Sequence, residues 1–124
     1  MLQLILHLFG DYVTQSDWMA NNKTKSTWAA FCHAWVYSFP FLFIASQKAW
    51  VVIIVTHLLI DRFRLARYVV FAKNFLGYPF PVWQDCKVTG YPSDRPAWLA
   101  VWLLIAADNT LHLIINYFAI RIFG

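Results

Sequence analysis

Residues 97–122 read AWLAVWLLIAADNTLHLIINYFAIRI, and this stretch decides the fold class. It contains no Pro or Gly and is longer than the roughly 20 helical residues that cross the hydrocarbon core of a bilayer. Its polar side chains Asp108, Asn109, His112 and Asn116 recur at three- and four-residue spacing. They therefore share one side of a helix. The stretch predicts a membrane-spanning helix with one polar face.

Three further stretches are mostly apolar and are separated from one another by polar residues: 1–20, 27–45 and 47–76. The whole chain is 60% hydrophobic and 13% charged, which lies outside the range of ordinary soluble domains. Residues 47–76 end in an Arg-rich amphipathic part, which predicts an extension along the membrane surface. We therefore expect an all-α integral membrane four-helix bundle, formed as a single domain over residues 1–124, whose third helix has a cytoplasmic extension.

The basic residues are unevenly distributed between the two ends of these predicted helices. Four antiparallel helices place eight of the ten Lys and Arg residues on one side of the membrane and only Lys48 and Arg121 on the other. The positive-inside rule then places the 77–96 loop in the cytoplasm and both termini outside. Membrane lipid also accounts for the formal net charge of +4 without a nucleic-acid partner. The N-terminal stretch lacks the features of a removable signal peptide.

Histidine and aspartate recur together in the predicted helices. Each helix contains one of the four histidines, and three of these have an aspartate four residues away. The pairs are His7 with Asp11, His57 with Asp61, and Asp108 with His112. Four residues make about one helical turn, so the two members of each pair point to the same side of their helix. Composition alone predicts about 0.4 such pairs, and the sequence has three. The repetition indicates a shared polar cluster inside the bundle.

Aspartates inside a bilayer need a compensating partner, because each costs roughly 2.5 to 3.5 kcal/mol near the membrane centre. A divalent cation provides it, since carboxylate and neutral imidazole both ligate Zn²⁺, Mn²⁺ or Fe²⁺. We expect one or two ions, with zinc as the first choice. The expected ligands are His7, Asp11, His33, His57, Asp61, Asp108 and His112, and the three aspartates are also the expected catalytic residues.

Five other polar residues lie where they could support such a site. Gln15, Asn109, Asn116 and Tyr37 are candidates for orienting the ligands, and Arg64, two turns after His57, for holding a substrate anion. The alternative for the amides, Tyr37 and the His/Asp set is hydrogen bonding between helices, worth about 0.6 to 2 kcal/mol per contact. For Arg64 the alternative is a headgroup anchor.

The segments HLFGDYVTQSDWMANNK (7–23), FCHAW (31–35), THLLIDRFR (56–64) and DNTLH (108–112) resemble a family of small bacterial and phage membrane proteins of unknown function. The shared pattern is H-x-x-x-D-x-x-x-Q-x-x-W-M-x-x-x-K, then H, then H-x-x-x-D, then D-[QN]-x-x-H. The matching positions are His7, Asp11, Gln15, Trp18, Met19, Lys23, His33, His57, Asp61, Asp108 and His112. Asn109 stands where many relatives have Gln. The resemblance implies a location in the bacterial inner membrane.

This family is distantly similar to a group described as membrane-bound metal-dependent hydrolases. The resemblance and the ligand set together favour a hydrolase in which the ion lowers the pKa of a bound water toward about 7. A membrane-embedded site points to a lipid-like or lipid-linked ester or phosphoester as substrate. Two rivals stay open: an ion or proton carrier that uses the same residues, and a non-catalytic membrane adaptor. The sequence also leaves a homo-oligomer open.

Overall fold

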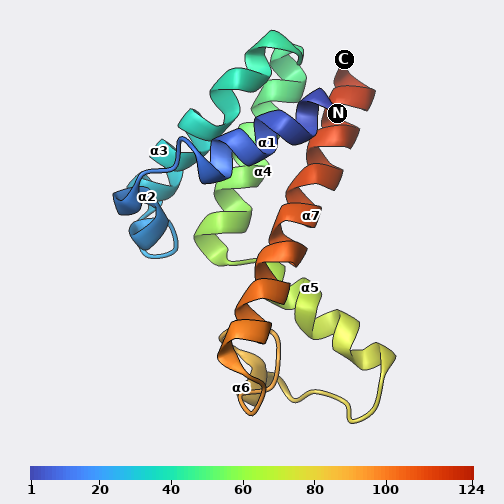
Figure 1. The fold of residues 1–124 in the computed structure, drawn as a ribbon. Helices are drawn as coiled ribbons and strands as arrows, with labels where there is room; N and C mark the ends of the chain where they lie inside the picture. Colours follow the sequence, from blue (N-terminus) through green and yellow to red (C-terminus); the bar gives the residue numbers. More distant parts are fainter. The chain divides into compact units, whose positions relative to one another are not determined.

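The computed structural model describes all 124 residues and contains only helices and their connections (Figure 1). The all-α prediction is confirmed. The elements are α1 (Leu2–Tyr12), α2 (Asp17–Asn22), α3 (Thr27–Ser38), the 3-10 helix η1 (Phe39–Phe43), α4 (Gln47–Phe63), α5 (Ala66–Lys73), the 3-10 helix η2 (Asn74–Leu76), α6 (Trp83–Cys86) and α7 (Ala97–Phe123).

Three of the four predicted long helices are interrupted. The first gives way to α2 at Ser16, whose Oγ accepts a hydrogen bond from the Met19 backbone N–H at 3.2 Å. The second continues as the 3-10 helix η1, with Pro40 in its first turn, because proline cannot donate a backbone hydrogen bond. The third breaks at Arg64, which has the left-handed conformation with φ 53° and ends α4.

These interruptions overturn the prediction of four membrane spans. With 11, 12 and 17 residues, α1, α3 and α4 are about 16, 18 and 25 Å long, shorter than a hydrocarbon core of about 30 Å. The 27-residue α7 is the one helix that is long and apolar enough to cross a membrane. The prediction for residues 97–122 therefore agrees with the structure, whereas a bundle of four spans does not.

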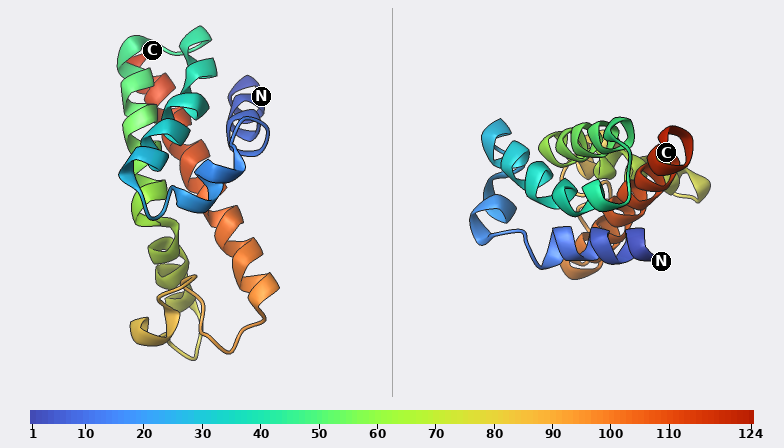
Figure 2. Two further views of the ribbon diagram at one scale, coloured as in Figure 1. Left: turned by 90° about the vertical axis from the view of Figure 1, so that its left-hand side faces the viewer. Right: turned by 90° about the horizontal axis from the view of Figure 1, so that it is seen from above.

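The chain divides into two compact units, and α7 contributes to both of them. The first unit comprises residues 1–64 and 112–124, and the second comprises residues 65–111. In the first unit α3 contacts α1, α2 and α4, and it runs beside α4 (Figure 2). Gln3 Nε2 also donates to the Leu113 carbonyl at 2.9 Å, which places α1 beside the end of α7. A single domain over the whole chain stays a prediction.

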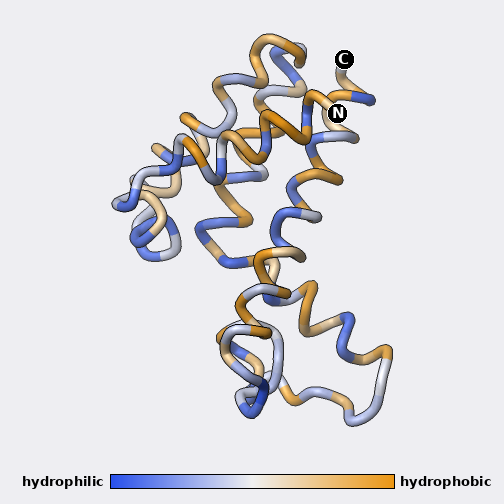
Figure 3. Tube along the Cα trace, viewed as in Figure 1, coloured by the Kyte–Doolittle hydropathy of each residue, from blue (hydrophilic) through white to orange (hydrophobic).

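The first unit buries polar side chains and exposes apolar ones. A small apolar cluster of Tyr37, Phe41, Ala49, Ile53 and Ala119 forms one part of its interior. The other buried side chains are mainly polar: His7, Asp11, His33, Ser38, His57, Asp61, His112 and Asn116. Hydrophilic positions interrupt the lengths of α4 and α7 in Figure 3. The interior of this unit is therefore organised around hydrogen bonds and charge as well as apolar contact.

The second unit is held together by aromatic and backbone contacts. Tyr68 stacks on Trp83 with ring centroids 4.9 Å apart, and Arg67 Nη1 donates to the Lys87 carbonyl at 2.9 Å. Cys86 is buried in this unit, and its burial, with Asp85 beside it, raises the pKa of the thiol. Neither cysteine forms a disulfide.

Helix α1 approaches α3 closely at Gly10. A Cβ atom added to this glycine would lie 2.5 Å from Tyr37 Cδ2 and 3.2 Å from Tyr37 Cα. Real carbon atoms do not come this close, so the two helices can keep their spacing only when residue 10 has no side chain.

We predict that Gly10→Ala lowers the free energy of unfolding by about 1 to 3 kcal/mol, because overpacking outweighs the better helix propensity of alanine. Thermal or denaturant unfolding of the purified protein measures the change. Gly77→Ala is the matched control, since no atom lies within 4 Å of its added Cβ and its φ is −142°. Equal destabilisation by the two variants would contradict the close approach at Gly10.

Candidate metal centre

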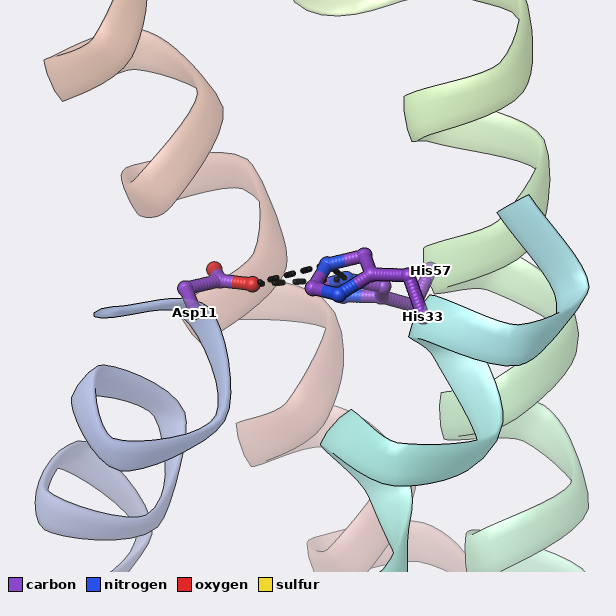
Figure 4. A group of neighbouring side chains, drawn as sticks. All are labelled: Asp11, His33 and His57. Carbon is purple, nitrogen blue, oxygen red and sulfur yellow. Dashed lines mark hydrogen bonds and ion pairs between the residues drawn. The ribbon is translucent and has the colours of Figure 1, made fainter. Parts of the chain in front are cut away.

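Four segments that are distant in sequence bring histidine and aspartate together in the first unit. Asp11 comes from α1, His33 from α3, His57 and Asp61 from α4, and His112 from α7. We call these five residues the His/Asp cluster. Each of the five residues is at most 8% exposed to solvent, so the cluster is closed to bulk water. Figure 4 shows Asp11, His33 and His57 pointing toward one another from three helices.

The closest contact in the cluster joins two imidazoles. The Nε2 atoms of His33 and His57 are 2.9 Å apart, and Asp11 Oδ1 lies 3.2 Å from the first and 3.5 Å from the second. Ligand atoms around a tetrahedral zinc ion are roughly 3.3 Å apart, given Zn–N distances of about 2.0 to 2.1 Å. The three atoms are therefore spaced as ligands of a single ion would be.

Asp61 makes a second set of contacts with the same imidazoles. Its Oδ2 lies 3.2 Å from His33 Nε2 and 3.3 Å from His57 Nε2, while its Oδ1 lies 3.2 Å from His112 Nε2. Two groups of three residues could thus hold a metal ion: Asp11, His33 and His57, and His57, Asp61 and His112. They share His57, which lies at the centre of the cluster.

Two buried oxygens in the cluster fit a cation better than they fit the hydrogen bonds of the protein. Asp11 Oδ1 and Asp61 Oδ2 are out of contact with solvent and accept no hydrogen bond of acceptable geometry, although Asp61 Oδ2 forms an ion pair with Lys23 Nζ at 2.9 Å. A buried carboxylate oxygen is costly unless a positive charge lies beside it, and Asp11 Oδ1 is contacted by the imidazoles of His33 and His57. Carboxylate and imidazole are also the donor types that Zn²⁺, Mn²⁺ and Fe²⁺ accept, so the residues fit such an ion.

Ring stacking orients His57, and no hydrogen bond to its Nδ1 atom does so. Neither His33 Nδ1 nor His57 Nδ1 has a hydrogen-bond partner, whereas metal-bound histidines in most proteins donate this second N–H. The His57 ring instead lies between two others, with centroids 3.6 Å from Tyr37 and 4.1 Å from His112. This sandwich fixes the plane in which His57 Nε2 faces the cluster.

His7 lies next to Asp11 Oδ2, whereas His33 lies next to Asp11 Oδ1. The Nδ1 atom of His7 is 2.7 Å from the Tyr37 hydroxyl, which also accepts a hydrogen bond from Asn116 Nδ2 at 2.6 Å. The direction of the hydrogen bond between His7 Nδ1 and the hydroxyl depends on the tautomer of His7. On the other side of the ring, His7 Nε2 lies 3.6 Å from Asp11 Oδ2. His7, Tyr37 and Asn116 therefore orient Asp11, and His7 belongs to neither ligand group.

A cation that we did not predict for the site lies against the cluster. Lys23 Nζ is 2.9 Å from Asp61 Oδ2, and its side chain is 20% exposed against 3% for that of Asp61. The sequence places Lys23 on the basic side of the membrane and within the family pattern, but does not predict it as a site residue. Its position at the end of the 7–23 segment, after His7, Asp11 and Gln15, is the signal that could have identified it.

The remaining predicted residues have different positions. Gln15 Nε2 donates to the Asp11 backbone carbonyl at 3.3 Å, so it braces the end of α1 and does not contact the carboxylate. Arg64 forms the left-handed end of α4. Asp108 and Asn109 are half-buried in the part of α7 that belongs to the second unit. Their participation in the centre stays a prediction.

The chain belongs to the DUF3307 family. Residues 1–115 match this family, which is described as a protein of unknown function. No curated protein and no solved structure matches the chain. The resemblance to a family of unknown function is confirmed, whereas the comparisons show neither a membrane protein family nor a similarity to hydrolases. The match to DUF3307 includes all five residues of the His/Asp cluster and Lys23, and it ends one residue before Asn116.

For this DUF3307 protein we predict that Tyr37→Phe weakens metal binding by about 10- to 100-fold, because the hydroxyl that holds His7 beside Asp11 is lost. The free energy of unfolding should fall by about 1 to 3 kcal/mol, since His7 and Asn116 keep their buried polar atoms. Metal titration and unfolding in detergent measure the two effects.

Tyr117→Phe serves as the control for this substitution. Tyr117 is 52% exposed on α7 in the same unit, and its ring contacts Phe118. It should leave both quantities unchanged. A Tyr37→Phe protein with the metal affinity of the wild type would show that the orientation of His7 does not matter to the centre.

Proposed function

We propose that this protein is a membrane-anchored, metal-dependent hydrolase. The observation that carries the proposal is the convergence of His33 Nε2, His57 Nε2, Asp11 Oδ1 and Asp61 Oδ2, in which each nitrogen lies 3.2 to 3.5 Å from each oxygen. Both oxygens are buried and accept no hydrogen bond, and Asp61 Oδ2 also forms an ion pair with Lys23. Zinc is the first choice of metal, with manganese or iron as alternatives and one or two ions as the expected number.

The protein's own residues would divide the work in the following way. A bound divalent ion supplies Lewis acidity, which lowers the pKa of a coordinated water toward about 7. His33 and His57 serve as neutral ligands, and the two aspartates balance the charge. Asp61 Oδ1 lies 3.2 Å from His112 Nε2, so this pair can hold a proton between the two atoms. The closed surroundings keep bulk water away from the centre.

Two features support a membrane location and a lipid-like substrate. Helix α7 is long and apolar enough to span a bilayer. The first unit also exposes large apolar side chains along α1, including Leu2, Ile5 and Phe9, while it buries its histidines. Contact of such an apolar surface with water is unfavourable, whereas contact with lipid tails is not. We therefore propose the bacterial inner membrane as the location and a lipid-like or lipid-linked ester or phosphoester as the substrate.

A proton carrier is the second candidate, and the contact between His33 and His57 favours it. Two Nε2 atoms 2.9 Å apart can share one proton, and carboxylates lie on both sides of them. Chains of His and Asp are the groups from which membrane proton relays are built. Metal content separates this candidate from a hydrolase.

We predict that protein purified in detergent retains about one or two transition-metal ions per chain, as the number of ligands allows. Asp11→Asn and Asp61→Asn should each remove the metal, because they keep size and polarity but delete an anionic ligand. Elemental analysis measures the metal content. Asp17→Asn is the control, since Asp17 is exposed in the first turn of α2.

Thermal unfolding with and without a chelator completes this test. A chelator should destabilise the wild type and Asp17→Asn but have little effect on Asp11→Asn and Asp61→Asn. Equal metal content and equal chelator response in all four proteins would leave the cluster as a hydrogen-bonded core and remove the basis of the hydrolase.

The loop before α7 should face the cytoplasm. Lys73, Lys87 and Arg95 precede this helix and only Arg121 lies at its far end, so the positive-inside rule gives that orientation. Cys86 is a poor reporter because it is buried and its thiol pKa is raised. We predict that Asp94→Cys, at an exposed position, resists an impermeant thiol reagent in intact cells and reacts after lysis. Rapid labelling of intact cells would reverse the orientation.

A further inference from the structure

The second unit contains a pocket of about 240 Å³ between the end of α5 and the loop that precedes α7. Asn74 Nδ2 donates to the Gly90 carbonyl at 3.1 Å, which joins the residue after α5 to this loop. Gly90 has φ 85°, and a Cβ atom added to it would lie 2.7 Å from Val70 Cβ, so the loop lies directly against α5. Contacts within the second unit therefore hold the pocket in shape, and no residue of the His/Asp cluster lines it.

Two cations and no acidic residue line this pocket. They are Lys73, the last residue of α5, and Arg95, two residues before α7. Lys73 Nζ lies 5.0 Å from the centre of the Tyr91 ring, which positions the ammonium group without neutralising its charge. Arg95 Nη1 lies 3.6 Å from Asp94 Oδ2, but both side chains are exposed, so this ion pair contributes little. The charge of the lining therefore suits an anion. We call the site the basic pocket.

The basic pocket lies beside apolar side chains and beside the beginning of α7. Leu76 and Tyr78 are almost fully exposed, and Phe80 is mostly exposed. Helix α7, which is long and apolar enough to cross a membrane, begins at Ala97. Aromatic side chains next to a membrane-spanning helix typically lie among lipid headgroups, and basic residues there attract anionic lipids. This combination distinguishes the pocket from a binding site for a soluble anion.

We propose that the basic pocket binds the phosphate group of an anionic phospholipid. The guanidinium group of Arg95 can contact phosphate through two N–H groups, and the ammonium group of Lys73 supplies a compact positive charge. Pockets for drug-sized ligands have volumes of roughly 300 to 1,000 Å³, so about 240 Å³ suits a headgroup better than a whole lipid. The acyl chains would then contact the exposed side chains of Leu76 and Tyr78. The inference rests on the proposed membrane location, but it does not require a metal or a hydrolase.

The test titrates the full-length protein, in a neutral detergent, with phosphatidylglycerol and with phosphatidylcholine. Native mass spectrometry measures the dissociation constant of the first bound lipid. We expect the wild type to prefer phosphatidylglycerol, which carries a net negative charge. The double variant Lys73→Gln/Arg95→Gln should lose about tenfold in affinity for phosphatidylglycerol, because two charge-assisted contacts at an exposed site are removed.

Lys87→Gln/Arg121→Gln is the matched control, because it removes the same charge from two exposed residues outside the pocket. It should bind phosphatidylglycerol as the wild type does. Lys73→Arg/Arg95→Lys keeps both charges and should retain most of the affinity. Should the double Gln variant fail to fold, the single variants Lys73→Gln and Arg95→Gln take its place, each with an expected loss of about threefold.

Two outcomes would overturn the basic pocket as a lipid site. Equal affinity of the wild type for the two lipids would remove the preference for an anion. An equal loss of affinity in Lys87→Gln/Arg121→Gln would show that overall charge, and not the pocket, attracts the lipid.

Inorganic phosphate distinguishes a lipid from a soluble ligand. It should compete poorly with phosphatidylglycerol, because it has no acyl chain to contact Leu76 and Tyr78. Competition at equal concentration would identify a soluble phosphate as the ligand and would overturn the lipid assignment.

The Asp11→Asn variant separates this inference from the proposed hydrolase. It should lose the metal but bind phosphatidylglycerol as the wild type does, since Asp11 belongs to the first unit. A wild-type protein without metal that prefers phosphatidylglycerol would contradict the hydrolase alone. A metal-loaded wild type without this preference would contradict the lipid site alone.

Discussion

The architecture of the first unit depends on two imidazole nitrogens that face each other at 2.9 Å. His33 Nε2 and His57 Nε2 cannot both carry a proton at this distance, nor can both present a lone pair, unless a cation or a shared proton lies between them. The stacking of Tyr37 and His112 on His57 holds the arrangement, and the carboxylates of Asp11 and Asp61 are placed to compensate positive charge there. The helices α1, α3, α4 and α7 contribute the residues that surround these two nitrogens.

The two carboxylates have different surroundings, although their contacts with the imidazoles are alike. Asp11 is backed by His7, which is hydrogen-bonded to the hydroxyl of Tyr37. Asp61 is flanked by the Lys23 ammonium group and by His112. Asp61 therefore already lies beside a permanent cation of the protein, whereas Asp11 contacts only imidazoles. The cluster therefore contacts the Lys23 ammonium group through Asp61.

Much of the cluster could be read from the sequence because it is encoded by local spacing. His57 and Asp61 are one helical turn apart, and the length of α7 follows from a long, mostly apolar run without Pro or Gly. The breaks in the other helices could not be read in this way. Arg64 ends α4 in the left-handed conformation, which glycine usually adopts at the end of a helix, so the sequence around Arg64 does not predict the break. Lys23 was missed because its contact depends on how a turn is fastened to another helix.

The close contact between Gly10 and Tyr37 has an evolutionary consequence. The Tyr37 ring that leaves no room for a side chain at position 10 also stacks on His57, and its hydroxyl is hydrogen-bonded to His7. A larger residue at position 10 would demand a smaller one at position 37, which would remove both the stacking partner and the hydroxyl. The two positions can therefore change only together, and a lineage that retains the cluster should retain this glycine and this tyrosine as a pair.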